Sequence, residues 1–260
     1  MTKIYYFSGT GNSLWSARKI AETIGGECAL VNIGVEAWKD KPMVQADAVV
    51  LVFPSYAFGL PLAVRHFAKN AVFKTPYLAA FVTYGSTPGG TLAALGRILK
   101  RKNIGRVFIG RIPAVENYIA IFGPPKAETE RRRLAMQDLA TKEAARCVME
   151  RCGNRVNTFR PLSAFIWSLF SLGAKIFYKQ FKVSDDCDGC GICEKVCPVS
   201  AISMKSAQGN RRPVFSAKCE HCQGCLNWCP KKAIHFGRLD SHLARYHHPG
   251  ISLQDISRKT

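Results

Sequence analysis

Acidic residues are scarce in this chain of 260 residues: 18 Asp and Glu stand against 37 Lys and Arg, which gives a formal net charge of +19 at pH 7. A long apolar run is also missing. The most apolar stretch, Leu162–Tyr178, is broken by three serines, Gly173 and Lys175, and a membrane-spanning helix needs about 20 apolar residues. We therefore expect a helix packed between two domains, with a helix lying on a membrane surface or a partner, or a span, as alternatives.

Three further absences narrow the class of protein. No cationic and apolar leader precedes the first predicted strand, Lys3–Phe7, so the sequence does not indicate secretion. Cysteine-rich chemistry without a leader is typical of the reducing cytoplasm. No motif of a DNA-reading domain occurs, so we expect no nucleic-acid partner. The basic surface is instead expected to attract an acidic protein, or to make peripheral contact with an anionic membrane.

Eight of the eleven cysteines form two runs of identical spacing, Cys-x-x-Cys-x-x-Cys-x-x-x-Cys-Pro, which begin 32 residues apart at Cys187 and Cys219. In such runs three close thiolates bind one iron–sulfur cube and the fourth binds the other cube. Structural zinc is the alternative for paired cysteines, but it requires neither the third cysteine nor the proline. The predicted ligands are Cys187, Cys190, Cys193 and Cys229 for the first cluster, and Cys219, Cys222, Cys225 and Cys197 for the second.

The repeat continues beyond the cysteines, since Ala201 coincides with Ala233 and Ile202 with Ile234. A repeat of this length predicts a small pseudo-symmetric domain with little core, held together largely by its clusters. Over about residues 183–237 the sequence resembles the bacterial two-cluster ferredoxins. The resemblance implies two 4Fe–4S clusters in a small α+β domain.

A turn rich in glycine and hydroxyl groups follows the first strand and precedes the helical pattern Leu14–Ile24. Backbone N–H groups and hydroxyls in this position form an anion site. A Walker loop would need a lysine, and a dinucleotide fingerprint would need glycine in place of Leu14. What remains is a loop like the one that holds the single phosphate of FMN in flavodoxins. Its residues are Ser8, Gly9, Thr10, Gly11, Asn12 and Ser13.

Two apolar segments, Asp47–Phe53 and Tyr77–Val82, predict buried parallel strands that end in loops rich in aromatics and glycine. Doubly wound folds bind ligands at these strand ends, beside the switch point. We expect Tyr84 to stack on a flat ring, with Tyr56 or Phe58 on its other face; simple capping of the sheet is the alternative. The expected binding residues are Pro54, Ser55, Tyr56, Ala57, Phe58, Gly59, Thr83, Tyr84, Gly85 and Gly90.

Two more strands, Cys28–Ile33 and Arg106–Pro113, and a helix over Lys126–Cys152 complete the domain. The pattern predicts an α/β fold, a doubly wound parallel sheet in the order 2-1-3-4-5. Residues 1–152 resemble flavodoxins, and the resemblance implies FMN as cofactor.

The same resemblance implies that backbone near Gly59 bonds to flavin N5. Asn117 and Tyr118 follow the fifth strand, where they reach the flavin edge or form a plain loop. The pair His247 and His248 in the tail is interpreted as structural rather than metal-binding. Three cysteines outside the runs are interpreted as buried or incidental thiols: Cys28, Cys147 and Cys152.

The whole chain resembles the flavodoxin–ferredoxin fusion proteins of anaerobes. We divide it into an FMN domain (1–153), an apolar linker helix (154–182), a ferredoxin domain (183–237) and a tail (238–260). With both cofactors bound the net charge falls to roughly +13. The resemblance implies electron transfer between a low-potential donor, two clusters, FMN and a partner. No second dinucleotide fingerprint provides for NAD(P)H, so an acidic ferredoxin-like protein is the expected donor. An FMN-dependent reductase of a small molecule is the alternative.

Overall fold

A parallel sheet of five strands forms the centre of the N-terminal domain in the computed structural model, which describes residues 1–154, 161–207, 210–237 and 243–257. The strands lie in the order β2-β1-β4-β6-β7, and all neighbours pair in parallel. Counted along the chain these five strands have the order 2-1-3-4-5, so the predicted doubly wound fold is confirmed. The strands are β1 (Thr2–Tyr6), β2 (Cys28–Asn32), β4 (Ala48–Pro54), β6 (Tyr77–Tyr84) and β7 (Arg106–Pro113).

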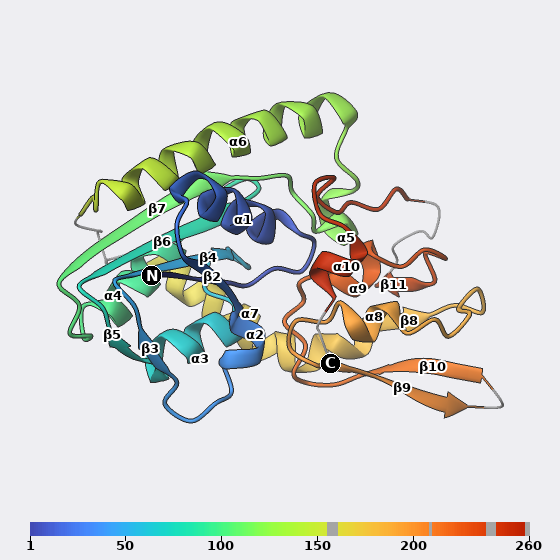
Figure 1. The fold of residues 1–260 in the computed structure, drawn as a ribbon. Coiled ribbons are helices and arrows are strands. Elements are labelled where there is room, and N and C mark those ends of the chain that lie inside the picture. Colours follow the sequence, from blue (N-terminus) through green and yellow to red (C-terminus); the bar gives the residue numbers. More distant parts are fainter. Residues whose placement is uncertain (155–160, 208–209, 238–242, 258–260) are drawn as a thin grey trace.

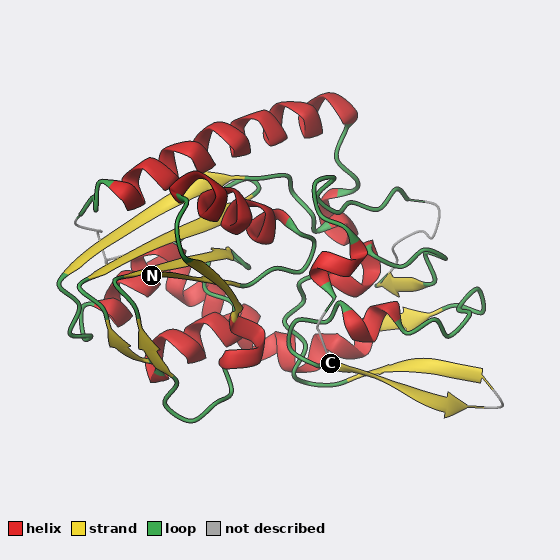
Figure 2. Ribbon diagram, viewed as in Figure 1, coloured by secondary structure: helices red, strands yellow, loops and turns green. Residues whose placement is uncertain are grey.

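Helices cover both faces of this sheet (Figures 1 and 2), with α1 and α6 on one face and α3 and α4 on the other. The strands are apolar on both sides because each side packs against helices. In β4, Val50 lies in one core cluster with Ile20 of α1, whereas Leu51 lies in another with Phe67 of α3. The helices are α1 (Asn12–Ile24), α3 (Leu62–Asn70), α4 (Thr91–Leu99) and α6 (Ala127–Met149).

Short helices and strands lie in the connections between these elements, and the sequence analysis did not predict them. The predicted strand Cys28–Ile33 ends one residue early, because Asn32 caps a short helix by accepting a hydrogen bond from Gly34 N at 2.8 Å. Two three-residue strands form a separate parallel pair. These elements are α2 (Ile33–Glu36), β3 (Met43–Gln45), β5 (Val72–Lys74) and α5 (Ile119–Phe122).

The C-terminal domain has the predicted pseudo-symmetry. Its two helices repeat with the same offset of 32 residues as the cysteines, and its four strands form two antiparallel pairs, β8 with β11 and β9 with β10. One half consists of β8 (Phe181–Val183), α8 (Ile192–Lys195) and β9 (Ile202–Ala207). The other consists of β10 (Asn210–Phe215), α9 (Gly224–Asn227) and β11 (Ile234–Phe236).

The two domains share one hydrophobic core, which the sequence did not predict. Leu226 and Ile234 of the C-terminal domain belong to the same buried cluster as Leu51 and Phe67 of the N-terminal domain. A second cluster joins Leu14 of α1 to Val196, Trp228 and Ile251. The small C-terminal domain therefore gains apolar burial from its neighbour, in addition to what its clusters would contribute.

Helix α7 (Pro161–Phe177) connects the domains, followed by a 3₁₀ turn, Tyr178–Gln180. Trp167 Nε1 donates to the Leu60 carbonyl at 2.9 Å, and the ring of Phe170 meets that of His221 at 6.1 Å. Within the described ranges, no helix is both long and apolar enough to traverse a membrane. Three parts of the predicted linker and tail lie outside the described residues: 155–160, 238–242 and 258–260.

Candidate cofactor sites

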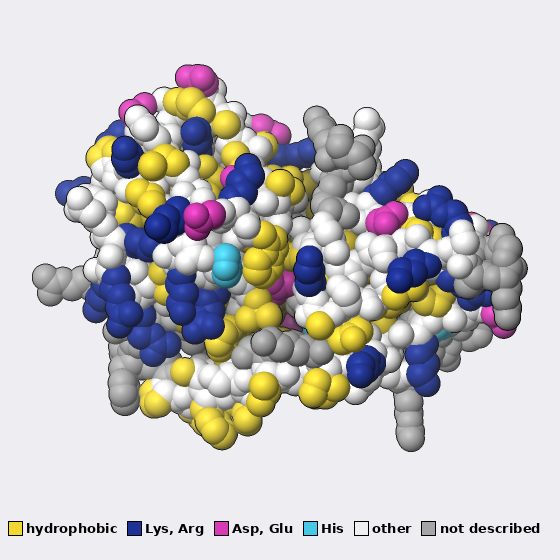
Figure 3. All heavy atoms as spheres, turned by 90° about the horizontal axis from the view of Figure 1, so that it is seen from below, with side chains coloured by type: hydrophobic (Ala, Val, Ile, Leu, Met, Phe, Trp, Pro, Cys, Tyr) yellow, Lys and Arg dark blue, Asp and Glu magenta, His cyan; other side chains and the backbone are white. Residues whose placement is uncertain are grey.

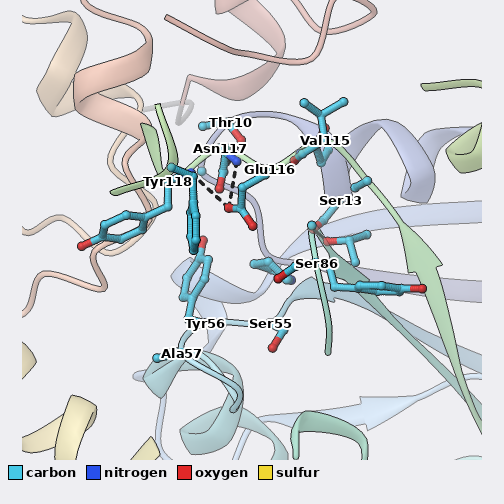
Figure 4. A pocket seen from close by; sticks show the side chains of 18 of the residues that line it. Thr10, Ser13, Ser55, Tyr56, Ala57, Ser86, Val115, Glu116, Asn117 and Tyr118 are labelled. Carbon is cyan, nitrogen blue, oxygen red and sulfur yellow. Dashed lines mark hydrogen bonds between the residues drawn. The ribbon is translucent and has the colours of Figure 1, made fainter. Parts of the chain in front are cut away.

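The three predicted flavin loops meet around one cavity of about 280 Å³ at the carboxyl ends of the strands (Figure 4). Its volume lies near the lower end of the range for small-molecule sites. Most of the predicted residues line it: Ser8, Gly9, Thr10, Asn12, Ser13, Pro54, Ser55, Tyr56, Ala57, Phe58, Thr83, Tyr84 and Gly85. Gly11, Gly59 and Gly90 do not.

The phosphate-type loop sits at the start of α1, whose first N–H groups have no intrahelical acceptors. Gly11 has a φ of 99°, a conformation that favours glycine, and its N–H donates to Ser8 Oγ at 3.1 Å. Ser13 Oγ lies 2.8 Å from Thr83 Oγ1, which ties the loop to the end of β6. Ser8, Thr10 and Ser13 are all buried. Amides and hydroxyls without a charged side chain fit one phosphate group.

The C-terminal tail holds this loop from outside. His248 N donates to the Thr10 carbonyl at 2.8 Å, and Tyr246 Oη donates to Asn12 Oδ1 at 2.8 Å. The His248 ring stacks on Trp15 with centroids 4.8 Å apart, and the His247 ring stacks on Trp228 at 4.0 Å. Gly11 therefore faces the tail rather than the cavity. Both histidines stack on tryptophans, as the structural interpretation of this pair predicts.

Gly59 closes a tight turn and faces away from the cavity. Its N–H and carbonyl both pair with Tyr56, at 2.9 and 3.0 Å. A Cβ at Gly59 would lie 1.9 Å from Trp167 Cδ1, so the close approach of α7 requires glycine there. The left-handed residues of the turn are Ala57 and Phe58, with φ of 45° and 64°. The expected backbone contact of Gly59 with a flavin is therefore not available in this conformation.

Gly90 also serves packing. Its N–H donates to the Phe58 carbonyl at 2.8 Å, and a Cβ there would lie 2.7 Å from Ser163 Cβ of α7. Gly85 does line the cavity, where a Cβ would lie 2.2 Å from Glu116 Oε2. Glycine at these two positions therefore admits neighbouring side chains.

Two aromatic side chains predicted to stack on a ring, Tyr84 and Tyr56, line the cavity and are partly buried. Burial raises the pKa of Tyr56 well above its usual value, and nearby Cys222 and Glu220 raise it further. Tyr56 thus lies between the cavity and the cysteines of the second run. Phe58 also lines the cavity and is 41% exposed. Stacking of these rings on a flavin stays a prediction.

Sequence reasoning missed part of the cavity wall. Glu116 Oε1 accepts from the backbone N–H groups of Asn117 and Tyr118 at 3.0 and 3.1 Å, and Asn117 Nδ2 donates to Thr10 Oγ1 at 2.6 Å (Figure 4). Asn117 and Tyr118 thus belong to the wall and not to a plain loop. Two further contributors come from distant segments, Phe170 of α7 and His221 of the C-terminal domain.

The predicted crossing of the two runs is reflected in which thiols influence one another. Burial and the nearby thiols of Cys190, Cys229 and Cys187 raise the pKa of Cys193 to about 12. Burial likewise raises the pKa of Cys222 well above its usual value, with Cys197 and Cys219 as neighbours. Cluster binding by these residues stays a prediction.

Backbone amides point at the sulfurs, as thiolate ligands require. Ala201 N donates to Cys197 Sγ at 3.2 Å and His221 N to Cys219 Sγ at 3.4 Å. Such bonds favour the thiolate over the thiol. Among the described residues, no three His, Cys, Asp or Glu side chains converge as a single metal ion would require. The donor set itself, four thiols in each predicted set with amides directed at their sulfurs, has the chemistry that a 4Fe–4S cluster takes.

The cavity and the second cysteine set share a wall. A Cβ at Gly9 would lie 2.8 Å from both the Cβ and the carbonyl oxygen of Cys222, and one at Gly224 would lie 2.9 Å from the Gly9 carbonyl. That carbonyl also accepts from Trp228 Nε1 at 3.1 Å. The glycine of the phosphate-type loop therefore rests directly on a predicted cluster ligand.

Glu220, between two cysteines of the second run, clamps the domains together. Its carboxylate oxygens accept from Leu62 N at 2.8 Å and Ala63 N at 2.6 Å, at the N-terminus of α3. Burial raises its pKa to about 7, and the two amide bonds oppose that shift. A helix N-terminus favours a carboxylate. The one sequence signal for this role is the position of Glu220, a charged residue between Cys219 and Cys222.

Comparison with known proteins found one matching family and several similar solved structures. Residues 186–236 match the family of the 4Fe-4S dicluster domain. Among solved structures, a flavodoxin from the domain Archaea shares 17% identity over 58% of this chain and 97% of its own, with a TM-score of 0.38. Two-electron reduced Megasphaera elsdenii flavodoxin shares 20% identity over 56% of this chain and 98% of its own, with a TM-score of 0.36.

An FMN-dependent NADH-azoreductase from Bacillus anthracis, solved in complex with FMN, shares 9% identity over 57% of this chain and 100% of its own, with a TM-score of 0.39. No curated protein sequence matches the chain. The sheet order and the matched C-terminal segment lead to one conclusion about architecture. The chain joins a flavodoxin-like α/β domain to a 4Fe–4S dicluster ferredoxin domain.

Proposed function

We propose that this protein transfers electrons between a low-potential donor, two 4Fe–4S clusters and FMN, and passes them on to a partner enzyme or acceptor. We place it in the cytoplasm, and within the flavodoxin–ferredoxin fusion proteins of anaerobes. The single observation that carries the proposal is the contact of Gly9 with Cys222. Because the loop expected to hold FMN touches a ligand of the second cluster, electrons would pass between the two sites within one chain.

Bound clusters would supply single-electron chemistry, and FMN would accept one or two electrons. The chain's own residues would position the groups and exclude water. His221 and Tyr56 both line the cavity on the side of the second cysteine set. The His221 ring packs against Phe181, and the Tyr56 ring packs against Phe7. Amides at the start of α1 would hold the phosphate, and the tail would keep that loop in place.

The first cysteine set is suited to be the entry point. Cys190 is exposed, whereas Cys225 of the second set is 7% exposed. Two exposed lysines lie near the first set, Lys195 two residues after Cys193 and Lys231 near Asp188, together with the exposed acidic residues Asp185 and Asp186. The net positive charge of the whole protein would attract an acidic ferredoxin-like donor, which would meet these two lysines. Electrons would then pass inward through Cys193 and Cys225, which lie within electrostatic reach of each other.

A rapid-mixing experiment tests this order. FMN-loaded full-length protein is mixed anaerobically with a reduced ferredoxin, and flavin bleaching is followed. Cys222→Ser should abolish reduction by ferredoxin while leaving reduction by dithionite intact. Cys28→Ser, outside both runs, is the matched control. If ferredoxin reduced the flavin of Cys222→Ser at the wild-type rate, the intramolecular route would be wrong.

A reductase acting on a small molecule is the second candidate. The cavity wall includes Ile121 and Phe122, which are 70 and 65% exposed, so one side reaches the surface. Catalytic turnover of small electron acceptors by the ferredoxin-fed protein would favour this reading. Transfer to protein acceptors alone would favour the carrier.

A further inference from the structure

The outer side of α7 exposes a row of large apolar side chains. Their exposed fractions run from 56 to 71%, and they recur every three or four residues, so they share one side of the helix. The inner side is occupied by Trp167 and Phe170, which pack against the protein. An exposed apolar face of this kind marks an interaction site. The row consists of Leu162, Phe165, Leu169, Leu172 and Ile176.

A basic groove of about 590 Å³ runs along the same helix. Ser163 and Trp167 of α7 form one wall, and the Arg65 guanidinium lies 4.9 Å from the centre of the Trp167 ring. No acidic side chain is among the described residues that line the groove. Nor, in the part of the chain that the structure describes, does any of its cations have a carboxylate within 4.0 Å. The cations are Arg65, Lys69, Arg97, Arg101 and Lys102.

The apolar row and the groove lie side by side. Figure 3 shows apolar side chains along the lower edge of the molecule, next to a group of Lys and Arg side chains. Lys102 donates to two backbone carbonyls, of Lys69 and Ala71. That leaves Arg65, Lys69, Arg97 and Arg101 as the cations available to an outside anion.

We propose that α7 and this groove dock the protein on an anionic lipid bilayer. The helix lies parallel to the surface, its apolar row enters the boundary between head groups and acyl chains, and the groove cations meet lipid phosphates. An apolar face flanked by cations, without acidic residues, is the pattern of interfacial helices. The sequence of α7 contains no Asp or Glu. A second copy of the chain would bring an equal basic groove against the first, which disfavours self-association through this face.

Vesicle flotation tests the proposal with the full-length protein. Vesicles of equal parts phosphatidylcholine and phosphatidylglycerol should carry the protein upward, whereas vesicles of phosphatidylcholine alone should not. Raising salt from about 0.1 M to about 1 M should release it. Leu169→Glu with Leu172→Glu should weaken binding about tenfold or more, and so should Arg97→Glu with Arg101→Glu.

Matched variants on α6 test whether the loss of binding depends on the α7 surface or only on the change in net charge. Leu139→Glu with Met149→Glu replaces exposed apolar residues, and Arg131→Glu with Arg132→Glu reverses exposed cations; both should bind as the wild type does. Circular dichroism and the unfolding temperature establish that each variant is folded. Three results would overturn the proposal: no flotation, unchanged flotation of both α7-side variants, or a solution dimer that the Leu169 and Leu172 variant dissolves while flotation persists.

Discussion

The two cysteine runs have the same spacing but opposite surroundings. The first set reaches the surface at Cys190, which is exposed. The second is enclosed by the N-terminal domain: Cys222 touches Gly9, and Glu220 is bonded to the start of α3. A repeat in sequence therefore supplies two equivalent ligand sets, and the neighbouring domain makes them unequal. Under the proposed function, that inequality would give electron flow an entry side and a delivery side.

The largest expected effect comes from removing one crossed ligand at a time. Wild-type protein should contain about eight irons per chain. Cys229→Ser should lose about half of the iron by losing the exposed cluster, although it belongs to the second run. Cys197→Ser should lose the enclosed cluster instead, together with flavin reduction by ferredoxin. Iron analysis and EPR spectra of the two variants distinguish the clusters. Loss of the same cluster in both variants would contradict the crossed assignment.

A substitution at Gly9 tests the wall that the cavity and the second cysteine set share. Gly9→Ala would place a Cβ 2.8 Å from backbone and side-chain atoms of Cys222, so the loop and the cluster ligand must separate. We expect a loss of about 1–3 kcal/mol in unfolding free energy, with slower reduction of the flavin. Gly153→Ala is the control, because its Cβ would meet only the flexible side chain of Arg106. Denaturant titration measures both, and equal effects would mean that the contact is unimportant.

The C-terminal tail contacts the phosphate-type loop through His248, so we expect the retention of FMN to fall at acidic pH. Burial, together with the nearby charge of His247, lowers the pKa of His248 to about 4. Its Nδ1 accepts from Gly250 N at 3.0 Å, a bond that protonation breaks. A depressed histidine pKa gives stability that is complete above its usual value of 6.5 and declines as pH falls toward 4.

At pH 5 we therefore expect the tail contact to be weaker by about 1–3 kcal/mol than at pH 7. His248→Asn keeps an acceptor without this titration and should flatten the profile. Release of flavin fluorescence between pH 7 and pH 5 is the measurement. A wild-type profile as flat as that of the variant would show that His248 does not carry the effect.

The smallest expected effect concerns the exposed side. Lys195→Glu with Lys231→Glu should slow reduction by an acidic ferredoxin about 3- to 10-fold at low salt, because the attraction that speeds encounter is lost. Lys74→Glu with Lys126→Glu changes the net charge equally at exposed positions elsewhere. Stopped-flow rates at several salt concentrations provide the comparison. Equal slowing in both pairs would point to net charge rather than to a docking surface.

Structural features that depend on residues close together in the sequence were predictable. The sheet order, the phosphate-type loop and the long helix α6 follow from periodicity and turn chemistry, because each pattern is written in consecutive residues. The functions of single glycines were less predictable. Gly59 was expected at the flavin, but it lies against Trp167, more than a hundred positions along the chain. A glycine required by a close approach looks the same in sequence as one required by a ligand.

The sequence by itself determined the fold class and the predicted cluster ligands: apolar strands that end in glycine-rich loops, and eight cysteines at fixed spacing. Only the tertiary structure decided which cysteine set faces the flavin-type cavity. It also decided that Glu116, His221 and Phe170 complete that cavity, and that the tail covers the phosphate-type loop. The physical reason is that local spacing fixes which groups a short segment presents, whereas burial and contact between distant segments depend on how complete surfaces pack.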